Sequence, residues 1–201
     1  MLQNLQINKM NTQTILQNIA KNIALTSEEK VHFISLLIEK KIKAKQYILK
    51  EGDICKSLTF INSGCCRAFN IDNNGYEHIL KFASQDYWVG DIFSFISQKP
   101  GVIFIQAMDE MEVLQIKKTD IDSLYDKIPK FERFFRILVE RAYMESQTRI
   151  LNTLSLSAEE RYLFFLKNYT HISHLIPQKQ IALYLGITPE FFSRMKKRIK
   201  K

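Results

Sequence analysis

The sequence predicts an α+β protein in which a group of short β-strands lies between helical segments. Residues 46–116 consist of brief apolar and β-branched runs separated by turn signals, a texture typical of a sandwich or small barrel. Residues 12–45 and the residues from 128 onward instead carry apolar side chains at helical spacing. Hydrophobic residues make up 46% of the 201 residues, so the chain has enough apolar material for a core.

The first segment, residues 12–45, is predicted to be helical. Thr26 and Glu29 have the spacing of a capping box, in which each side chain satisfies a backbone N–H of the other residue. The apolar residues that follow repeat at helical spacing, and they are Val31, Ile34, Leu37 and Ile38. The N-terminal stretch "MLQNLQINKMNTQ" has no charged start followed by an apolar block, so we expect no signal peptide and a cytoplasmic protein.

The second segment is predicted to form strands. Its apolar runs are "YIL", "LTFI", "CCRAFNI", "HILKF", "VIFIQAM" and "VLQI". The clearest turn is "DNNG" at residues 72–75, because Asn and Gly tolerate the positive φ angles of hairpin turns. This segment also holds Cys55, Cys65 and Cys66, an odd number with no spacing that suits zinc. We expect buried cysteines that pack as small hydrophobes, while a redox role for Cys65 and Cys66 stays open.

The third segment begins with a long helix over residues 128–154. Its apolar stripe could pack on the chain's own barrel or on the same helix of a second copy, and we expect a homodimer. The main members of the stripe are Phe131, Phe134, Phe135, Leu138, Val139, Ala142, Ile150, Leu151 and Leu154. Ser157 and Glu160 then form a second capping-box pattern that starts another helix.

The last segment has the spacing of a helix-turn-helix that starts at Gln178. The fifth position, Ala182, is small where the two helices cross closely, and the ninth, Gly186, suits the left-handed conformation of the tight turn. Thr188 is placed as the N-cap of the second helix, and Pro189 takes its favoured first position. The remaining pattern positions are apolar, and they are Ile181, Leu185, Ile187, Phe192 and Met195.

Charge is concentrated on the same end of the chain. Residues 153–201 carry nine Lys or Arg and three Glu, a net charge of +6, out of +8 for the whole chain. A positive field confined to one end indicates a polyanionic partner, and we expect double-stranded DNA. The residues expected at base edges are Pro189, Glu190, Ser193 and Arg194. Those expected at phosphates are Lys179, Thr188, Lys196, Lys197, Arg198, Lys200 and Lys201.

The order of parts resembles the Crp/Fnr superfamily of bacterial transcription regulators, from about residue 15 to residue 201. The stretches that carry the resemblance are "YILKEGDICKSLTFINSGCCRAF", "YWVGDIFSFISQKP", "IQAMDEMEVLQIKKTDIDSLYDKIPKFERFFRIL", "LSAEERYLFFL" and "IPQKQIALYLGITPEFFSRMKK". They look most similar to the branch common in Bacteroidetes. The resemblance implies an N-terminal jelly-roll β-barrel of the cyclic-nucleotide-binding type with flanking helices, a long dimerisation helix and a C-terminal helix-turn-helix domain. It places Glu190 and Arg194 on base-contacting positions and Pro189 where an arginine often reads DNA.

The effector site departs from the family's pattern. Members that bind cyclic AMP carry a Gly-Glu pair followed by an Arg-Ser pair. In this chain Gly90 and Asp91 take the place of the first pair, and the carboxylate side chain of Asp91 is shorter than that of Glu. Gly101 and Val102 fall roughly where the second pair would be, and an anion there would lack an arginine partner. We therefore expect an effector pocket around Gly90, Asp91 and Val102 that does not bind cyclic AMP. We also expect no cofactor and no metal, because the barrel segment has a single histidine, His78, and no cysteine cluster precedes it.

These observations predict a sequence-specific, DNA-binding transcription regulator that is not an enzyme. The expected divisions are an effector domain at residues 1–118, a linker with the dimerisation helix at 119–154, and a DNA-binding domain at 155–201. Expected partners are DNA, a second copy of the chain and RNA polymerase, with no membrane. The alternative is a ligand-sensing barrel whose basic C-terminal helices contact a protein or a membrane.

Overall fold

The structure is a computed structural model that describes residues 11–199. Lys200 and Lys201, two of the predicted phosphate contacts, lie outside the described residues. The helices are α1 (Gln13–Ala20), α2 (Ser27–Ser35), α3 (Ile92–Ser97), α4 (Lys118–Lys127), α5 (Lys130–Ser155), α6 (Ala158–Asn168), α7 (Gln178–Leu185) and α8 (Pro189–Ile199). The strands are β1 (Ile38–Ile42), β2 (Tyr47–Leu49), β3 (Ser57–Ser63), β4 (Cys65–Ile71), β5 (Glu77–Ser84), β6 (Trp88–Val89), β7 (Phe104–Ala107) and β8 (Met111–Lys117).

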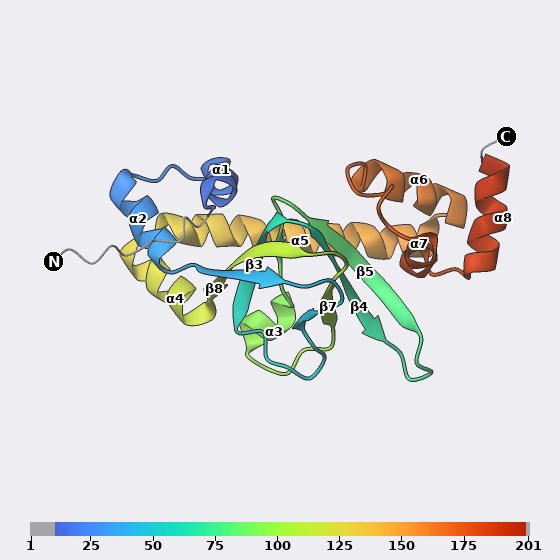
Figure 1. Ribbon diagram of the computed structural model, residues 1–201, viewed down its shortest axis with the longest axis horizontal. Helices are drawn as coiled ribbons and strands as arrows, with labels where there is room; N and C mark the ends of the chain where they lie inside the picture. Colours follow the sequence, from blue (N-terminus) through green and yellow to red (C-terminus); the bar gives the residue numbers. More distant parts are fainter. Residues whose placement is uncertain (1–10, 200–201) are drawn as a thin grey trace.

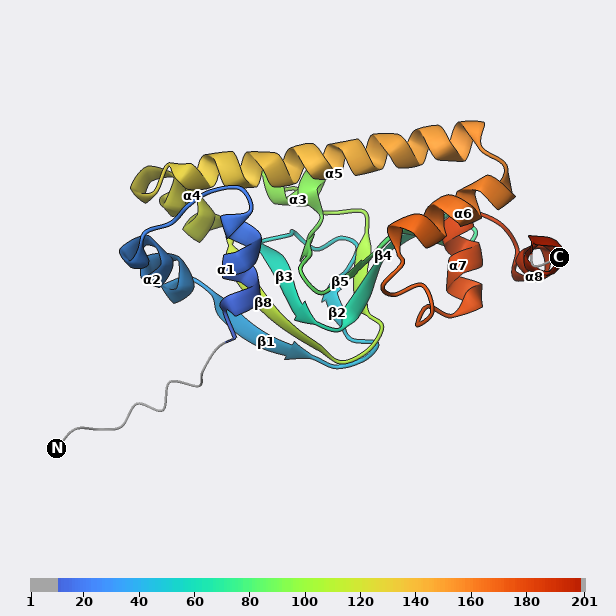
Figure 2. The same ribbon diagram turned by 90° about the horizontal axis from the view of Figure 1, so that it is seen from above.

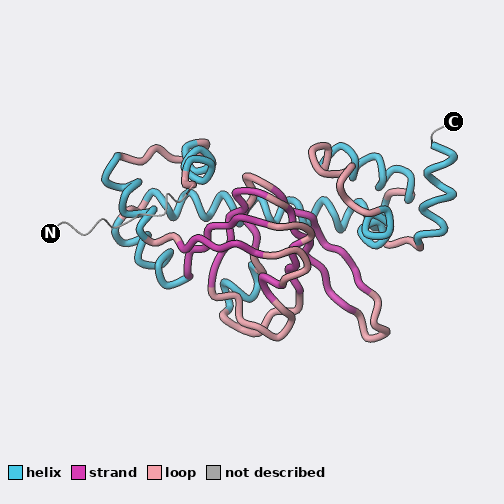
Figure 3. The backbone as a smooth tube through the Cα atoms, viewed as in Figure 1, coloured by secondary structure: helices cyan, strands magenta, loops and turns pink. Residues whose placement is uncertain are grey.

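The long helix α5 runs the length of the molecule, and the other elements lie along it (Figure 1). The helices α1, α2 and α4 gather at its N-terminal end, the strands lie at its middle, and α6, α7 and α8 lie at its C-terminal end (Figure 3). Seen from above, every other described element lies on one side of α5 (Figure 2). Although α5 has 26 residues, no described helix is both long and apolar enough to cross a membrane.

The strands form two four-stranded antiparallel sheets, which together make up the barrel. One has the order β1-β8-β3-β6 and the other β2-β7-β4-β5, which confirms the predicted jelly-roll architecture. The turn at residues 72–75 joins β4 to β5, with Gly75 at φ +83° as the hairpin prediction requires. The capping boxes at Thr26 and at Ser157 are both formed.

The core of the barrel extends onto the first half of α5. Phe131, Phe134 and Phe135 are buried there, and the Trp88 ring of β6 packs edge-on against Phe134, with ring centroids 6.0 Å apart. Leu138 still packs against this core, whereas further along α5 the apolar stripe is largely exposed. The first half of the stripe therefore packs on the chain's own barrel, one of the two alternatives that the sequence left open, while the second half is exposed in the single chain.

Two local predictions were wrong. Residues 38–42, read as the end of a helical segment, form strand β1, because all five pair with β8. Tertiary pairing overrides a helical repeat as short as Ile34, Leu37 and Ile38. Residues 92–97, read as part of the strand segment, form the short helix α3, which Asp91 caps by accepting a hydrogen bond from the Ser94 backbone N–H at 3.0 Å.

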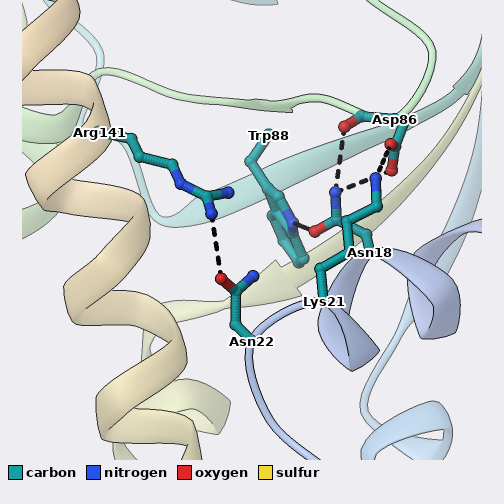
Figure 4. A network of polar contacts seen from close by, with 6 residues as sticks. All are labelled: Asn18, Lys21, Asn22, Asp86, Trp88 and Arg141. Carbon is teal, nitrogen blue, oxygen red and sulfur yellow. Dashed lines mark hydrogen bonds and ion pairs between the residues drawn. The ribbon is translucent and has the colours of Figure 1, made fainter.

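A polar network ties the N-terminal helices to the barrel and to α5 (Figure 4). The Asn18 amide donates to the Asp86 carboxylate at 2.8 Å and accepts from the Trp88 indole N–H at 3.1 Å. Arg141, on α5, donates to the Asn22 side chain at 3.1 Å. Within the described residues, Arg141 therefore hydrogen-bonds to the N-terminal part of the molecule and to no part of α6, α7 or α8.

Candidate nucleic-acid interface

The C-terminal helices α7 and α8 are joined by the tight corner that the spacing predicts. Gly186 follows α7 at φ +68°, a left-handed conformation that costs glycine nothing because it has no Cβ. Thr188 then caps α8, its hydroxyl accepting from the Phe191 backbone N–H at 3.2 Å, and Pro189 is the first residue of the helix. Gly186 therefore ends α7, and Thr188 and Pro189 determine where α8 begins.

Burial of two α8 side chains orients the helix. Phe192 and Met195 are fully buried, and Phe192 packs edge-on against Tyr162 of α6, with ring centroids 5.1 Å apart. Ala182 on α7 is fully buried as well, as the close crossing requires. We call α6, α7 and α8 together the head.

The opposite face of α8 is open to solvent and carries the predicted base-reading residues. Pro189, Glu190, Ser193 and Arg194 are all exposed, and Ser193 and Arg194 follow Glu190 by three and four residues, on the same face one turn further along. Within the described residues, the Arg194 side chain makes no hydrogen bond or ion pair, so its planar guanidinium is exposed to water. A guanidinium in this state is able to pair with a guanine edge.

The predicted phosphate contacts surround this face. Lys179 on α7 and Lys197 on α8 are exposed, and Lys196 is half-buried. Arg198 is exposed but already paired, since its Nη2 lies 3.0 Å from Oε1 of Glu159 on α6. This pair was not predictable from local spacing, because 39 residues separate the two side chains.

Two arginines that the sequence analysis missed hold the end of α7. Arg161 donates to the Leu185 carbonyl at 3.1 Å, and Arg149 donates to the Tyr184 carbonyl at 2.7 Å. These are among the last carbonyls of α7, which have no partner within the helix, and a cation there also complements the helix dipole. Their position relative to Gly186 was not visible from sequence because it depends on how the head meets α5.

The predicted effector residues do not share one environment. Gly90 lines a pocket of about 480 Å³ that is partly open to solvent, together with Thr59 and Gln115. Asp91 is buried as the cap of α3, and its Oδ2 has no hydrogen-bond partner among the described residues. Val102 is 61% exposed and lies on the surface.

The loop around Gly101 packs directly against Asp91. A Cβ on Gly101 would lie 2.4 Å from the Asp91 Oδ2, so no side chain fits there without a shift. The loop is also pinned at both hydrogen-bonding groups of Gly101, which bond to Gly52 and Asp53 at 2.9 Å each. The Asp91 carboxylate is therefore covered by backbone rather than open to a ligand.

The three cysteines are buried and unpaired. Burial raises the pKa of the Cys65 thiol to about 12, helped by the nearby Asp109 carboxylate, and burial also raises the pKa of Cys66 to about 12. Both thiols are neutral at physiological pH, which makes them poor nucleophiles and poor metal ligands. Within residues 11–199, no three His, Cys, Asp or Glu side chains gather in a way that could hold a metal ion.

Comparison with known proteins agrees with this architecture. The cyclic nucleotide-binding domain matches residues 39–127. The chain is 30% identical over 190 residues to the fumarate and nitrate reduction regulatory protein of Vibrio cholerae, covering 87% of this chain and 74% of the relative. It is 28% identical over 188 residues to the anaerobic regulatory protein of Haemophilus influenzae, covering 87% and 72%.

Solved structures share the fold. A Crp/Fnr-family regulator from Eubacterium rectale superposes with a TM-score of 0.69 at 18% identity, over 88% of this chain and 84% of that one. The c-di-GMP responsive global regulator CLP of Xanthomonas campestris superposes with a TM-score of 0.71 at 13% identity, over 87% and 92%. Since the similar proteins are regulators and not enzymes, and the likeness spans barrel, α5 and head, this chain belongs to the Crp/Fnr family of transcription regulators.

Proposed function

We propose that two copies of the chain, joined along α5, bind a two-fold DNA operator with each α8 in a major groove. The observation that carries the proposal is the exposed face of α8. It presents Glu190, Ser193 and Arg194 to solvent while Phe192 and Met195 anchor the helix from behind. A helix held this way, with cations at its sides, has the shape and charge of a recognition helix.

The roles of individual residues follow from their chemistry. Arg194 pairs with guanine O6 and N7, and Glu190 accepts from cytosine N4. Pro189 and Ser193 contact base edges beside them. Phosphates are bound by the cations around this face and by Thr188, which position the helix without reading sequence. They are Lys179, Lys196, Lys197 and Arg198, together with Lys200 and Lys201 outside the described residues.

The uncovered face of α5 supports the two-fold arrangement. Tyr143, Ile150 and Leu154 lie on one face, seven and four residues apart, and all three are more than half exposed. A row of large apolar side chains in contact with water is unfavourable, and a second copy of α5 covers it with an identical row. We expect RNA polymerase as the partner of the DNA-bound dimer.

We propose further that the barrel does not respond to cyclic AMP. The carboxylate that would receive the ribose hydroxyl, on Asp91, is covered by Gly101, and no arginine lies between Arg67 and Arg133 to neutralise the phosphate. An unpaired phosphate anion next to apolar side chains costs several kcal/mol. The division at residues 118 and 154 is likewise our proposal for where the effector part, the dimer helix and the DNA-binding part begin and end.

A gel-shift series on genomic fragments tests the main proposal. The six cations proposed at phosphates in each copy, counted twice in a dimer, predict that the logarithm of the binding constant falls with the logarithm of the salt concentration with a slope of roughly −11. Absence of any shift at low salt would contradict the proposal. In that case, binding to anionic vesicles or to a captured protein would favour the alternative of a barrel sensor whose basic helices meet another partner. A thermal-shift assay with cyclic AMP is expected to show no change.

A further inference from the structure

The head is fastened to the barrel as well as to α5. Phe82 of β5 packs against Phe165 of α6 and Tyr184 of α7, at centroid distances of 6.1 and 5.8 Å. It also packs against Tyr169, the residue that ends α6, at 5.7 Å. Ile79 of β5 belongs to the same buried cluster. The orientation of α8 therefore depends on how α7 rests on β5, in addition to the chain joint between α5 and α6.

One side chain touches all three parts at this junction. Arg149 extends from α5, and its Nη2 donates to the carbonyl of Ile79 on β5 at 2.8 Å and to the carbonyl of Tyr184 on α7 at 2.7 Å. Its guanidinium also lies over the Tyr184 ring, 3.9 Å from the centroid. Two acceptors, one in the barrel and one in the head, are thus held within reach of a single nitrogen.

Both acceptors are available for local structural reasons. In the pairing of β4 with β5, Ala68 faces Lys81 and Phe69 faces Ile79, so Leu80 is an extra residue in a β-bulge. A bulge disrupts the ladder locally, which lets the neighbouring Ile79 carbonyl accept from a donor outside the sheet. The Tyr184 carbonyl lies in the last turn of α7, where no partner exists within the helix.

We propose that Arg149 is a positioning residue that sets the orientation of α8 relative to α5, and thereby the spacing of the two half-sites that a dimer reads. This rests on the proposed function. α8 begins five residues after Tyr184, beyond the Gly186 corner, so a rotation of the α7 end is carried directly to α8. In a two-fold dimer, the same rotation moves the two recognition helices apart or together.

The test uses three variants. Arg149→Met keeps the length of the side chain but removes every donor, and Arg149→Lys keeps the charge but loses the planar fork. Arg141→Met is the matched control, because it removes the same charge from the same helix and loses only a contact to Asn22. Each is assayed on duplexes whose two half-sites are separated by spacers that differ by single base pairs.

Wild type and Arg141→Met are expected to bind the duplex with one spacer length at least about tenfold more tightly than duplexes with the other spacers. In Arg149→Met, the difference in affinity between spacers is expected to fall below about threefold, and Arg149→Lys should give an intermediate difference. The salt slope of both variants should equal that of wild type, because no phosphate contact is lost. A wild-type spacer preference in Arg149→Met would overturn the proposal.

Hydrogen exchange without DNA separates failure of this proposal from failure of DNA binding. If Arg149 positions the head, Arg149→Met exchanges faster over residues 178–185 and 77–84, whereas β8 exchanges as in the control. Equal exchange in the two Met variants would overturn the proposal even if no duplex were bound. Should Arg149→Met fail to fold, Arg149→Lys provides the same comparison.

Discussion

Replacement of Leu154 by glutamate tests whether the exposed face of α5 joins two copies. Leu154 is 78% exposed in the single chain, so its replacement disturbs no packing within one copy. Burying a leucine side chain contributes about 2 kcal/mol, and a two-fold interface buries it twice, which gives about 4 kcal/mol. Because about 1.4 kcal/mol is a factor of ten, the dimer dissociation constant should rise about a thousandfold, and more where the two carboxylates repel each other.

Sedimentation equilibrium measures this effect directly. Wild type is expected to sediment as a dimer at micromolar concentration and Leu154→Glu as a monomer with an unchanged circular dichroism spectrum. Val31→Glu is the matched control, since Val31 is 68% exposed on α2, away from α5's uncovered face, and this variant should remain dimeric. A monomeric wild type, or a dimeric Leu154→Glu, would refute the argument that the apolar face of α5 forms the dimer.

Three further predictions concern the head and the barrel. Phe192→Ala should destabilise the protein by about 3–5 kcal/mol in a denaturant titration, because it leaves a cavity in the core of the head; an effect below about 1 kcal/mol would contradict the burial of Phe192. Glu159→Gln removes the carboxylate that competes with phosphate for Arg198, so a dimer should bind DNA more tightly, whereas Glu140→Gln, which breaks the Arg136 pair on α5, should leave the affinity unchanged; equal affinities of the two variants would contradict a phosphate contact by Arg198. Cys65 and Cys66 should resist iodoacetamide at pH 8 in the folded state and react on unfolding. Since their pKa is higher in the folded than in the unfolded chain, stability should fall as the pH rises above about 9, and rapid labelling of the native protein at pH 8 would contradict this.

Features set by neighbouring residues were predictable from the sequence. The caps at Thr26, Ser157 and Thr188, and the corner at Gly186, depend on residues within four positions of one another. The spacing of the helix-turn-helix predicted which side chains of the head are buried, and the structure agrees at Ile181, Ala182, Leu185, Phe192 and Met195, whereas Ile187 is half-buried.

Features that depend on distant partners were not predictable. Strand β1 exists because it pairs with β8, at separations from 69 residues (Ile42 and Met111) to 77 residues (Ile38 and Gln115), and its own sequence continues a helical repeat. The contacts of Arg149 require both the bulge at Leu80 and the orphan carbonyl at Tyr184, neither of which shows in the local pattern around residue 149. The pairing of Arg198 with Glu159 depends in the same way on how α6 and α8 cross.

The central claim is that the exposed face of α8 reads DNA sequence, and it is tested by selecting bound duplexes from a randomised pool. Wild type should select two half-sites related by two-fold symmetry. Arg194→Ala should lose the preference at one base pair of each half-site, by about 1–3 kcal/mol, and keep the others, whereas Arg198→Ala should weaken binding evenly and select the wild-type sequence. If Arg194→Ala selects the same sequence as wild type with the same strength, α8 does not read bases as described.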